Sequence, residues 1–282
     1  MSALFETLLV ARDAPLAHGH VSSHARGVWL VTLNRPDCRN AMSLQMVQEL
    51  RAVLADAEAS GDARVIVLRG AGGHFCSGGD IKDMAAARMR PLDANAANRD
   101  PLAAVNAAFG ELCVAYAGTG LALVVIAEGT VMGGGFGLAC VADVVLASPT
   151  AQFRLPETSL GVVPAQVASF LVERLGYSEA RRLAVTGARL GAHAALTLRL
   201  VHEVHGPAEL EIALARTLDE ILQCAPGALA ATKRLIAKAR FERPASLVAE
   251  AAAVFSNALQ SPEGQEGTRA FIQKRKPSWA PK

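Results

Sequence analysis

A glycine-rich stretch from Gly129 to Asp143 is the feature that most constrains how this chain folds. It contains the run Gly133-Gly134-Gly135 and follows an apolar run, Leu121 to Ala127. Because such a run cannot turn either side toward water, it predicts a buried strand. Glycines at a strand-to-helix junction allow close backbone approach, and free N–H groups at a helix start favour a negatively charged oxygen. The stretch therefore predicts either an anion-binding junction or a tight turn with close helix–sheet packing.

Spacing and composition exclude several function classes. The glycines break the G-x-G-x-x-G frame, because Leu138 and Cys140 stand at the third glycine, and no G-x-S-x-G occurs. A net charge of +2 is too small to favour binding to nucleic acid electrostatically. No apolar run reaches the roughly 18 residues of a membrane span, and residues 1–14 lack a signal layout. We expect a soluble cytoplasmic protein with no nucleic-acid or membrane partner.

The cysteines and histidines predict neither a disulfide framework nor a metal site. The five cysteines are odd in number, scattered and free of any C-x-x-C pair, so we expect reduced, mostly buried thiols. The histidine cluster of His18, His20 and His24 is interpreted as a solvated turn, since a metal site needs both the right ligands and the right geometry.

Strands alternate with helices in the first part of the chain, and helices alone follow. The expected strands are 28–33, 64–69, 121–127, 144–147 and 200–204. The expected helices are one capped by Ser43, one that begins near Ile81 and is capped by Asp80, 165–175, 178–186, one from Pro207, 227–239 and 245–259. Alanine-rich residues 85–104 are expected to form a mobile loop or a broken helix. This order predicts an α/β core over 1–205 and a helical region over 206–282.

A second glycine-rich junction, Gly70 to Asp80, also follows a predicted strand. Two such junctions can each point one N–H at a single oxygen, which is an oxyanion hole whose donors typically contribute about 3–4 kcal/mol each. Glu157 adds an acid among partly apolar neighbours, where its proton affinity can be tuned toward neutrality. It is alternatively an ordinary surface glutamate or a helix cap.

Five ordered motifs run from about residue 28 to 277. They are Asn34-Arg35-Pro36 with Asn40-Ala41-Met42, Phe75 to Lys82, Gly133-Gly134-Gly135 through Asp143, Ala151-Gln152-Phe153 with Pro156-Glu157 and Leu160-Gly161, and Phe271 with Lys274-Arg275-Lys276. Together they resemble the enoyl-CoA hydratase/isomerase (crotonase) family. The resemblance implies an α/β fold, a crotonase-like spiral of ββα units with a C-terminal helical trimerisation region. It also implies homotrimers or hexamers built as dimers of trimers, and an acyl-CoA thioester as substrate with no further cofactor.

The resemblance assigns roles to particular residues. The N–H groups of Gly79 and Gly134 resemble the pair that holds the thioester oxygen, and Glu157 matches one of two catalytic glutamates. Proton removal at C2, or addition of water at C3, pushes charge onto that oxygen as an enolate. The coenzyme would lie along the turn from Arg35 to Ala41 and near Lys82, with Lys274 contacting phosphate from a neighbouring subunit. The substrate-binding candidates are Arg35, Ala41, Gly78, Lys82, Met84, Gly137, Pro164, Gln166, Phe271 and Lys274.

Two positions depart from the family pattern. Hydratases of this family carry their other glutamate where this chain has Gly137, which puts plain straight-chain hydration in doubt. After Val163-Pro164 the family usually continues with small residues and glycines, whereas this chain has Ala165 and Gln166. Gln166 either orients water or a substrate carboxylate, or caps a helix.

Several functions therefore stay open. The first is hydration of an unsaturated acyl-CoA, or migration of its double bond, with Glu157 as acid and base. A non-catalytic acyl-CoA-binding protein of the same fold is the second. A third uses Cys76 with His74 as a thiol nucleophile, although Cys76 is also explained as a small core residue.

A narrower resemblance concerns residues 155–166 with 135–140. They are similar to the branch that hydrates isohexenylglutaconyl-CoA in acyclic terpene breakdown. A substrate with its own carboxylate would, on this hypothesis, help to fix the water that the missing glutamate no longer holds.

Overall fold

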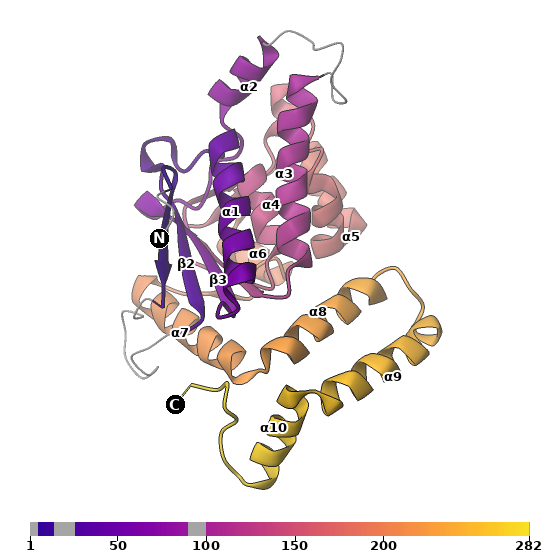
Figure 1. The fold of residues 1–282 in the computed structure, drawn as a ribbon. Coiled ribbons are helices and arrows are strands. Elements are labelled where there is room, and N and C mark those ends of the chain that lie inside the picture. Colours follow the sequence, from indigo (N-terminus) through magenta and orange to yellow (C-terminus); the bar gives the residue numbers. More distant parts are fainter. Residues whose placement is uncertain (1–4, 14–25, 90–99, 282) are drawn as a thin grey trace.

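The computed structural model describes residues 5–13, 26–89 and 100–281, which form the α/β fold shown in Figure 1. The strands are β1 Leu8–Arg12, β2 Val28–Leu33, β3 Val65–Gly70, β4 Ala122–Ala127, β5 Thr130–Met132, β6 Val144–Ala147, β7 Gln152–Arg154, β8 Leu190–Gly191 and β9 Glu203–Val204. The α-helices are α1 Leu44–Ser60, α2 Ile81–Arg88, α3 Pro101–Gly118, α4 Gly134–Val141, α5 Val167–Thr186, α6 Ala192–Thr197, α7 Pro207–Gln223, α8 Pro226–Ala239, α9 Pro244–Gln260 and α10 Pro262–Ile272.

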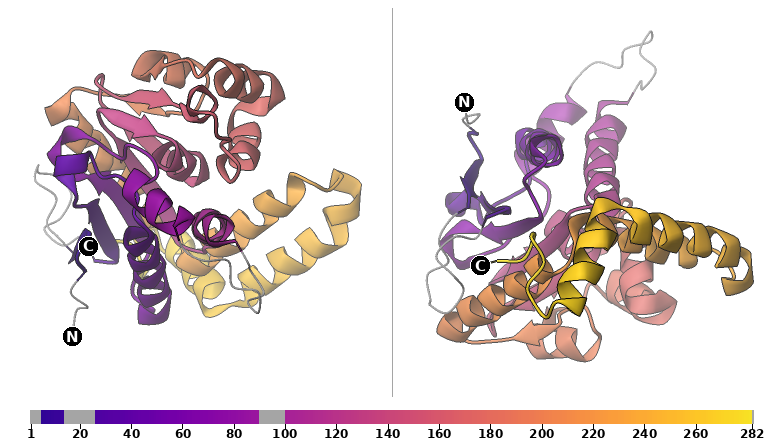
Figure 2. Two further views of the ribbon diagram at one scale, coloured as in Figure 1. Left: turned by 90° about the horizontal axis from the view of Figure 1, so that it is seen from above. Right: turned by 60° about the horizontal axis from the view of Figure 1, so that its bottom comes forward.

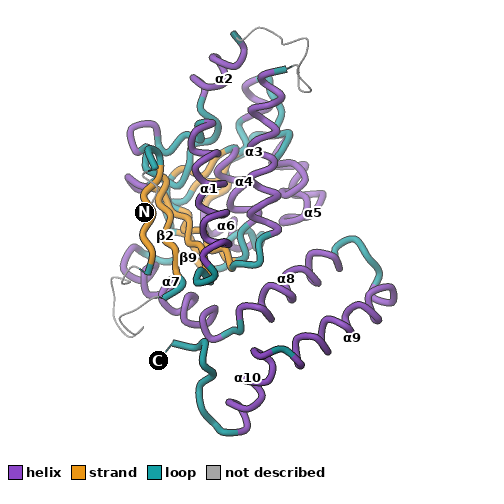
Figure 3. The backbone as a smooth tube through the Cα atoms, viewed as in Figure 1, coloured by secondary structure: helices purple, strands orange, loops and turns teal. Residues whose placement is uncertain are grey.

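A six-stranded sheet in the order β1-β2-β3-β4-β6-β9 forms the centre of the molecule (Figure 3). Its first two strands pair antiparallel and all other neighbours pair parallel. On β3, Val65 and Val67 pack with α7 on one face, whereas Ile66 and Leu68 join the main core on the other. Because helices cover both faces, the strands are almost continuous apolar runs, as the sequence predicted for 121–127.

A second, three-stranded sheet in the order β5-β7-β8 carries the glycine run. Its strand β5 leads directly into α4, which begins at Gly134. Two isolated bridges, Met42 to Gly79 and Cys76 to Val131, tie the other glycine junction to the approach of α1 and to β5. The two junctions predicted from the sequence are therefore held next to each other by backbone pairing.

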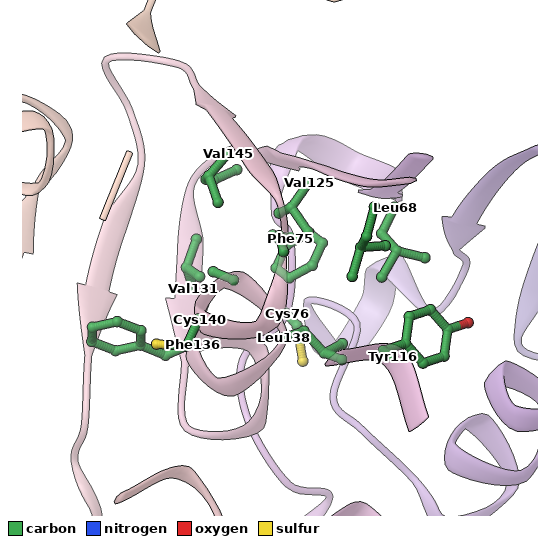
Figure 4. Packing of buried hydrophobic residues seen from close by; sticks show 14 of the residues in the cluster. Leu68, Phe75, Cys76, Tyr116, Val125, Val131, Phe136, Leu138, Cys140 and Val145 are labelled. Carbon is green, nitrogen blue, oxygen red and sulfur yellow. The ribbon is translucent and has the colours of Figure 1, made fainter. Parts of the chain in front are cut away.

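The main hydrophobic core lies between the strands and helices α1, α3, α4 and α5. Figure 4 shows Phe136 and Leu138 of α4 among Phe75, Val131 and other side chains of this cluster. The ring of Phe136 lies 5.4 Å from that of Phe153, centroid to centroid. Since these side chains are fully buried, they fix the position of α4 and hence of the glycine run.

Helices α8, α9 and α10 extend away from the core (Figures 1 and 2). These helices and the turn between α8 and α9 leave large apolar side chains in solvent, among them Phe241 of the turn, Phe255 and Phe271, which are 75%, 69% and 85% exposed. Helix α7 differs, because its buried leucines pack on the central sheet. Because of this packing, α7 is part of the core, although it is the first helix of the predicted helical region 206–282. The predicted domain boundary after residue 205 stays a prediction.

Most predicted elements are present. Ser43 and Asp80 cap α1 and α2 by accepting from the N–H groups of Met46 and Lys82. The two helices predicted over 165–175 and 178–186 form α5, which Gly176 interrupts with φ 74°. The sequence analysis missed most of α3, as well as α6, α10, β1, β5, β7 and β8.

Two predictions fall partly or wholly outside the described residues. In the segment 85–104, the first residues belong to α2 and the last to α3, which favours the predicted broken helix over the predicted loop. Residues 90–99 of this segment lie outside the described residues. His18, His20 and His24 also lie outside the described residues.

Within the described ranges, no helix is long and apolar enough to cross a membrane, and the cytoplasmic location stays a prediction. All five cysteines are free, and Cys76, Cys113 and Cys140 are buried.

Candidate active site

A cavity of about 320 Å³ brings together residues from both glycine junctions. It is lined by Gly79, Gly134, Glu157, Met84, Pro164 and Gln166, all predicted site residues. Much of the remaining wall is apolar and comes from α1, α3 and the segment before α5: Met42, Leu44, Val47, Leu102, Val105, Phe109, Val162 and Val163. The cavity is therefore an apolar chamber with a few polar groups, which is typical of a small-molecule site.

Backbone pairing frees the N–H of Gly79. Met42 donates to the carbonyl oxygen of Gly78 and accepts from the N–H of Asp80, at 2.8 and 2.9 Å, so the N–H of Gly79 between them faces the other way. Gly134 is the first residue of α4, where an N–H has no partner within the helix. Neither N–H donates to another described residue. Two free donors on one cavity are compatible with the predicted oxyanion hole, which stays a prediction.

Glu157 presents an unpaired carboxylate to the same cavity. It begins a short 3-10 helix, η3 (Glu157–Leu160), and its Oε1 lies 3.0 Å from where a Cβ on Gly133 would stand. Its Oε2 is buried and has no hydrogen-bond partner among the described residues. Burial raises the pKa of Glu157 above its ordinary value of 4.5, and a backbone hydrogen bond offsets this only partly. An unpaired carboxylate with a raised pKa suits general acid–base chemistry.

Side chains from two helices crowd the space beside Gly137, where the family resemblance expects a second glutamate. A Cβ placed on Gly137 would lie 3.1 Å from Cγ2 of Val167 and 3.2 Å from Cζ of Phe109. The ring of Phe109 lies equally close to the position of a Cβ on Gly134, at 3.2 Å. Side chains from α3 and α5 thus occupy the space into which a residue at position 137 would project.

Gln166 lies against α3. Its Nε2 donates to Oδ1 of Asn106 at 2.9 Å, and its Oε1 lies 2.1 Å from where a Cβ on Gly110 would stand. Only glycine can sit at position 110 with Gln166 in this place. Gln166 is the N-cap residue of α5, as one of its two interpretations expected, but its side chain makes no capping hydrogen bond.

The comparisons with known proteins agree with this geometry. A model of the enoyl-CoA hydratase/isomerase family matches residues 23–282. The chain belongs to the enoyl-CoA hydratase/isomerase family. The crystal structure of a family member from Marinobacter aquaeolei is 46% identical with a TM-score of 0.88, over 97% of this chain and 99% of that one. Pseudomonas aeruginosa AtuE is 49% identical with a TM-score of 0.86, over 98% and 100%. The probable enoyl-CoA hydratase echA8 of Mycobacterium bovis is 31% identical over 98% of both chains.

Family membership confirms the crotonase-type fold, while individual site roles rest on geometry. Arg35 is engaged inside the protein, since its Nη1 pairs with Asp80 at 2.8 Å and donates to the carbonyl oxygen of Ala41 at 2.6 Å. Among the other predicted residues, Gly78, Lys82, Gly137, Phe271 and Lys274 do not line the cavity. Ala41 does not line it either, and the roles of all these residues in substrate binding stay predictions.

Three functional candidates on α3 escaped the sequence analysis: Asn106, Phe109 and Gly110. The helix is apolar nearly all round and rich in alanine, so it shows no clear period. A glycine inside a helical stretch is costly, and Gly110 was the one signal of a close contact there.

The thiol-nucleophile interpretation was wrong. Cys76 is fully buried, and burial raises the pKa of its thiol to about 12, so almost no thiolate forms near neutral pH. His74 does not activate it, because its Nδ1 accepts a hydrogen bond from the N–H of Thr130. Across the part of the chain that the structure describes, no group of three His, Cys, Asp or Glu side chains can hold a metal ion.

Proposed function

We propose that this family member hydrates a 2-enoyl-CoA thioester. The proposal rests on one observation: the free N–H groups of Gly79 and Gly134 and the unpaired carboxylate of Glu157 share one cavity. Hydrogen bonds from two such donors stabilise the enolate oxygen that forms when the thioester is attacked at C3.

Glu157 moves the proton in this scheme. The oxygen of a water molecule attacks C3, and the electron pair of the C2–C3 double bond moves onto the thioester oxygen. Glu157 takes one proton of the water and delivers it to C2 as the enolate collapses, so the carboxylate is ionised before and after the cycle. The second proton stays on the new hydroxyl group.

The acyl group is proposed to be branched and of the glutaconyl type. The apolar part of the cavity wall, which includes Met42 and Val163, suits a bulky hydrocarbon branch. The narrower resemblance of residues 135–140 and 155–166 supports the same class.

A second candidate is migration of a double bond between C3 and C2. The observation in its favour is the position of Phe109 and Val167 beside Gly137, which leaves Glu157 without a partner glutamate. One carboxylate can take a proton at one carbon and return it at the other without binding water.

Product analysis in ¹⁸O-labelled water separates these candidates. The purified protein is incubated with trans-2-enoyl-CoA, 3-enoyl-CoA and branched glutaconyl-CoA substrates, with Glu157→Gln as the control. The expected result is that the product of the wild-type protein contains one labelled water and that the Glu157→Gln variant forms no such product. Double-bond migration without label would overturn hydration in favour of isomerisation, and the absence of any turnover would leave a non-catalytic acyl-CoA-binding protein.

We further propose that the chain assembles as a trimer, or as a hexamer of two trimers, through α8, α9 and α10. The exposed apolar side chains of these helices, such as Ile236 and Phe255, support this proposal, because so much apolar surface is costly in water.

A further inference from the structure

The amide pair of Asn106 and Gln166 is an uncharged polar feature of the cavity that the proposed chemistry leaves without a role. The two side chains come from α3 and from the start of α5 and are joined by one hydrogen bond. That bond uses one N–H of Gln166 and the carbonyl oxygen of Asn106. Both N–H bonds of Asn106 and the second N–H of Gln166 have no acceptor among the described residues. The pair therefore offers a surplus of donors.

The charged groups on the cavity wall are all acidic. They are Glu157, Asp80 and Asp83, and no lysine, arginine or histidine lines the described cavity. Asp80 is paired with Arg35, and Asp83 accepts from the N–H of Leu44 at 2.6 Å. Amide N–H groups are thus the side-chain donors in this wall that can receive an anionic group of the ligand.

We propose that Asn106 and Gln166 bind a second carboxylate on the acyl chain, and that this carboxylate takes over the task of the glutamate absent at Gly137. The inference rests on the proposed hydration. In a glutaconyl chain the second carboxyl carbon is two bonds from C3. A water attacking C3 then closes a six-membered hydrogen-bonded ring with that carboxylate.

The water is held by two carboxylates, one from the protein and one from the substrate. It donates one hydrogen bond to Glu157, which takes that proton to C2, and the other to the substrate carboxylate. Both donations leave the oxygen lone pairs free to attack C3. A neutral amide pair holds the substrate carboxylate without the full positive charge that would weaken it as an acceptor.

The experiment compares two matched substrates. One is 3-methylglutaconyl-CoA, and the other is its neutral analogue with an isopropyl group in place of the carboxylate. The wild-type protein is expected to hydrate the acid with a kcat/KM about 10–100-fold higher, since a hydrogen bond to a charged group contributes about 1.5–3 kcal/mol. Asn106→Leu and Gln166→Leu are expected to bring this ratio close to 1. Gln166→Glu is expected to invert it, because the protein then repels the substrate carboxylate.

Gly110→Ala tests the position of the amide without changing its chemistry. The new methyl group displaces Gln166 and is expected to lower the ratio as Gln166→Leu does. The control is Gly118→Ala on the same helix, where a Cβ meets nothing within 4 Å, and it is expected to leave the ratio unchanged. A wild-type ratio near 1 with hydration intact, or a ratio that survives both leucine variants, overturns the inference and leaves the proposed function standing. No hydration of either substrate by the wild type overturns both.

Discussion

Phe109 lies over Gly137: its Cζ is 3.2 Å from the position that a Cβ on Gly137 would take. The same ring lies beside Gly134, whose N–H is one of the two proposed oxyanion donors. Phe109 thus crowds the position at which the family resemblance expects a second glutamate. A glutamate at position 137 would require the ring of Phe109 and the side chain of Val167 to shift.

We expect Gly137→Glu to lower activity and to destabilise the fold. Overfilling a packed site costs about 1–3 kcal/mol, because Phe109 and Val167 would have to move. The pair Gly137→Glu with Phe109→Ala removes the obstacle and is expected to regain stability and to hydrate crotonyl-CoA faster than either single variant. Thermal unfolding and steady-state kinetics of all four proteins test this. Equal stability of Gly137→Glu and the wild type would show that Phe109 is no obstacle.

The raised pKa of Glu157 predicts a pH-dependent effect on stability. Its native pKa exceeds the ordinary 4.5 because burial disfavours the charge, so the native state binds its proton more tightly than the unfolded state. Stability that is fully present below 4.5 is then lost as the pH rises through the native pKa. Glu157→Gln should therefore melt about 1–3 °C higher than wild type at pH 7. This difference in Tm between the variant and the wild type should vanish at about pH 3.5. The same difference in Tm at both pH values would contradict the prediction.

Asp80 predicts the opposite dependence. Burial alone would raise its pKa, but the hydrogen bond and charge of Arg35 and the bond from the N–H of Lys82 hold it below the ordinary 3.8. The stability that its charge provides is present above 3.8 and is lost as the pH falls through the lower native pKa. Asp80→Asn keeps a helix cap but loses the ion pair, so its Tm should fall by about 2–4 °C at pH 7. Scanning calorimetry from pH 7 to about pH 2 should show the two proteins converge.

Cys76 should be dispensable for catalysis. Its thiol is buried with a pKa of about 12, whereas Cys38 and Cys224 are exposed. Brief treatment with iodoacetamide should alkylate the two exposed thiols, as peptide mass mapping will show, without loss of activity. Cys76→Ala should keep hydration within about twofold and cost about 1 kcal/mol of stability. If iodoacetamide inactivated the protein and acyl-CoA prevented this, the result would instead support Cys76 as a catalytic nucleophile.

Phe255→Glu should disrupt assembly. The side chain is 69% exposed in the single chain, and a carboxylate buried in an interface without a partner is costly. Analytical ultracentrifugation of wild type should show the mass of three or six chains, and that of the variant a single chain. Gln260→Glu, on the same helix α9, is the charge-matched control and should leave the mass unchanged. A wild-type protein that sediments as one chain would contradict the assembly proposal.

The candidate site was only partly predictable from the sequence. Glycine runs after apolar strands mark backbone junctions wherever they occur, so both junctions were predicted from local pattern, whereas the family resemblance singled out Gly79 and Gly134 within them. Glu157 was a candidate because of its partly apolar neighbours, but the same pattern allowed an ordinary surface glutamate, and the family resemblance favoured the catalytic role. Asn106 and Phe109 could not be found, since they act through contacts with residues about 30 to 60 positions away in the chain.

The sequence by itself determined the local elements and the family. Apolar runs buried on both faces fix β2 to β4, and the caps at Ser43 and Asp80 fix two helix starts, because these depend on neighbours along the chain. Only the tertiary structure decided what surrounds each group. Whether Glu157 is paired, which side chain fills the space at Gly137 and what Gln166 touches depend on how α3 and α5 pack across the glycine junctions. Packing joins residues that are distant in sequence, and no local periodicity records those contacts.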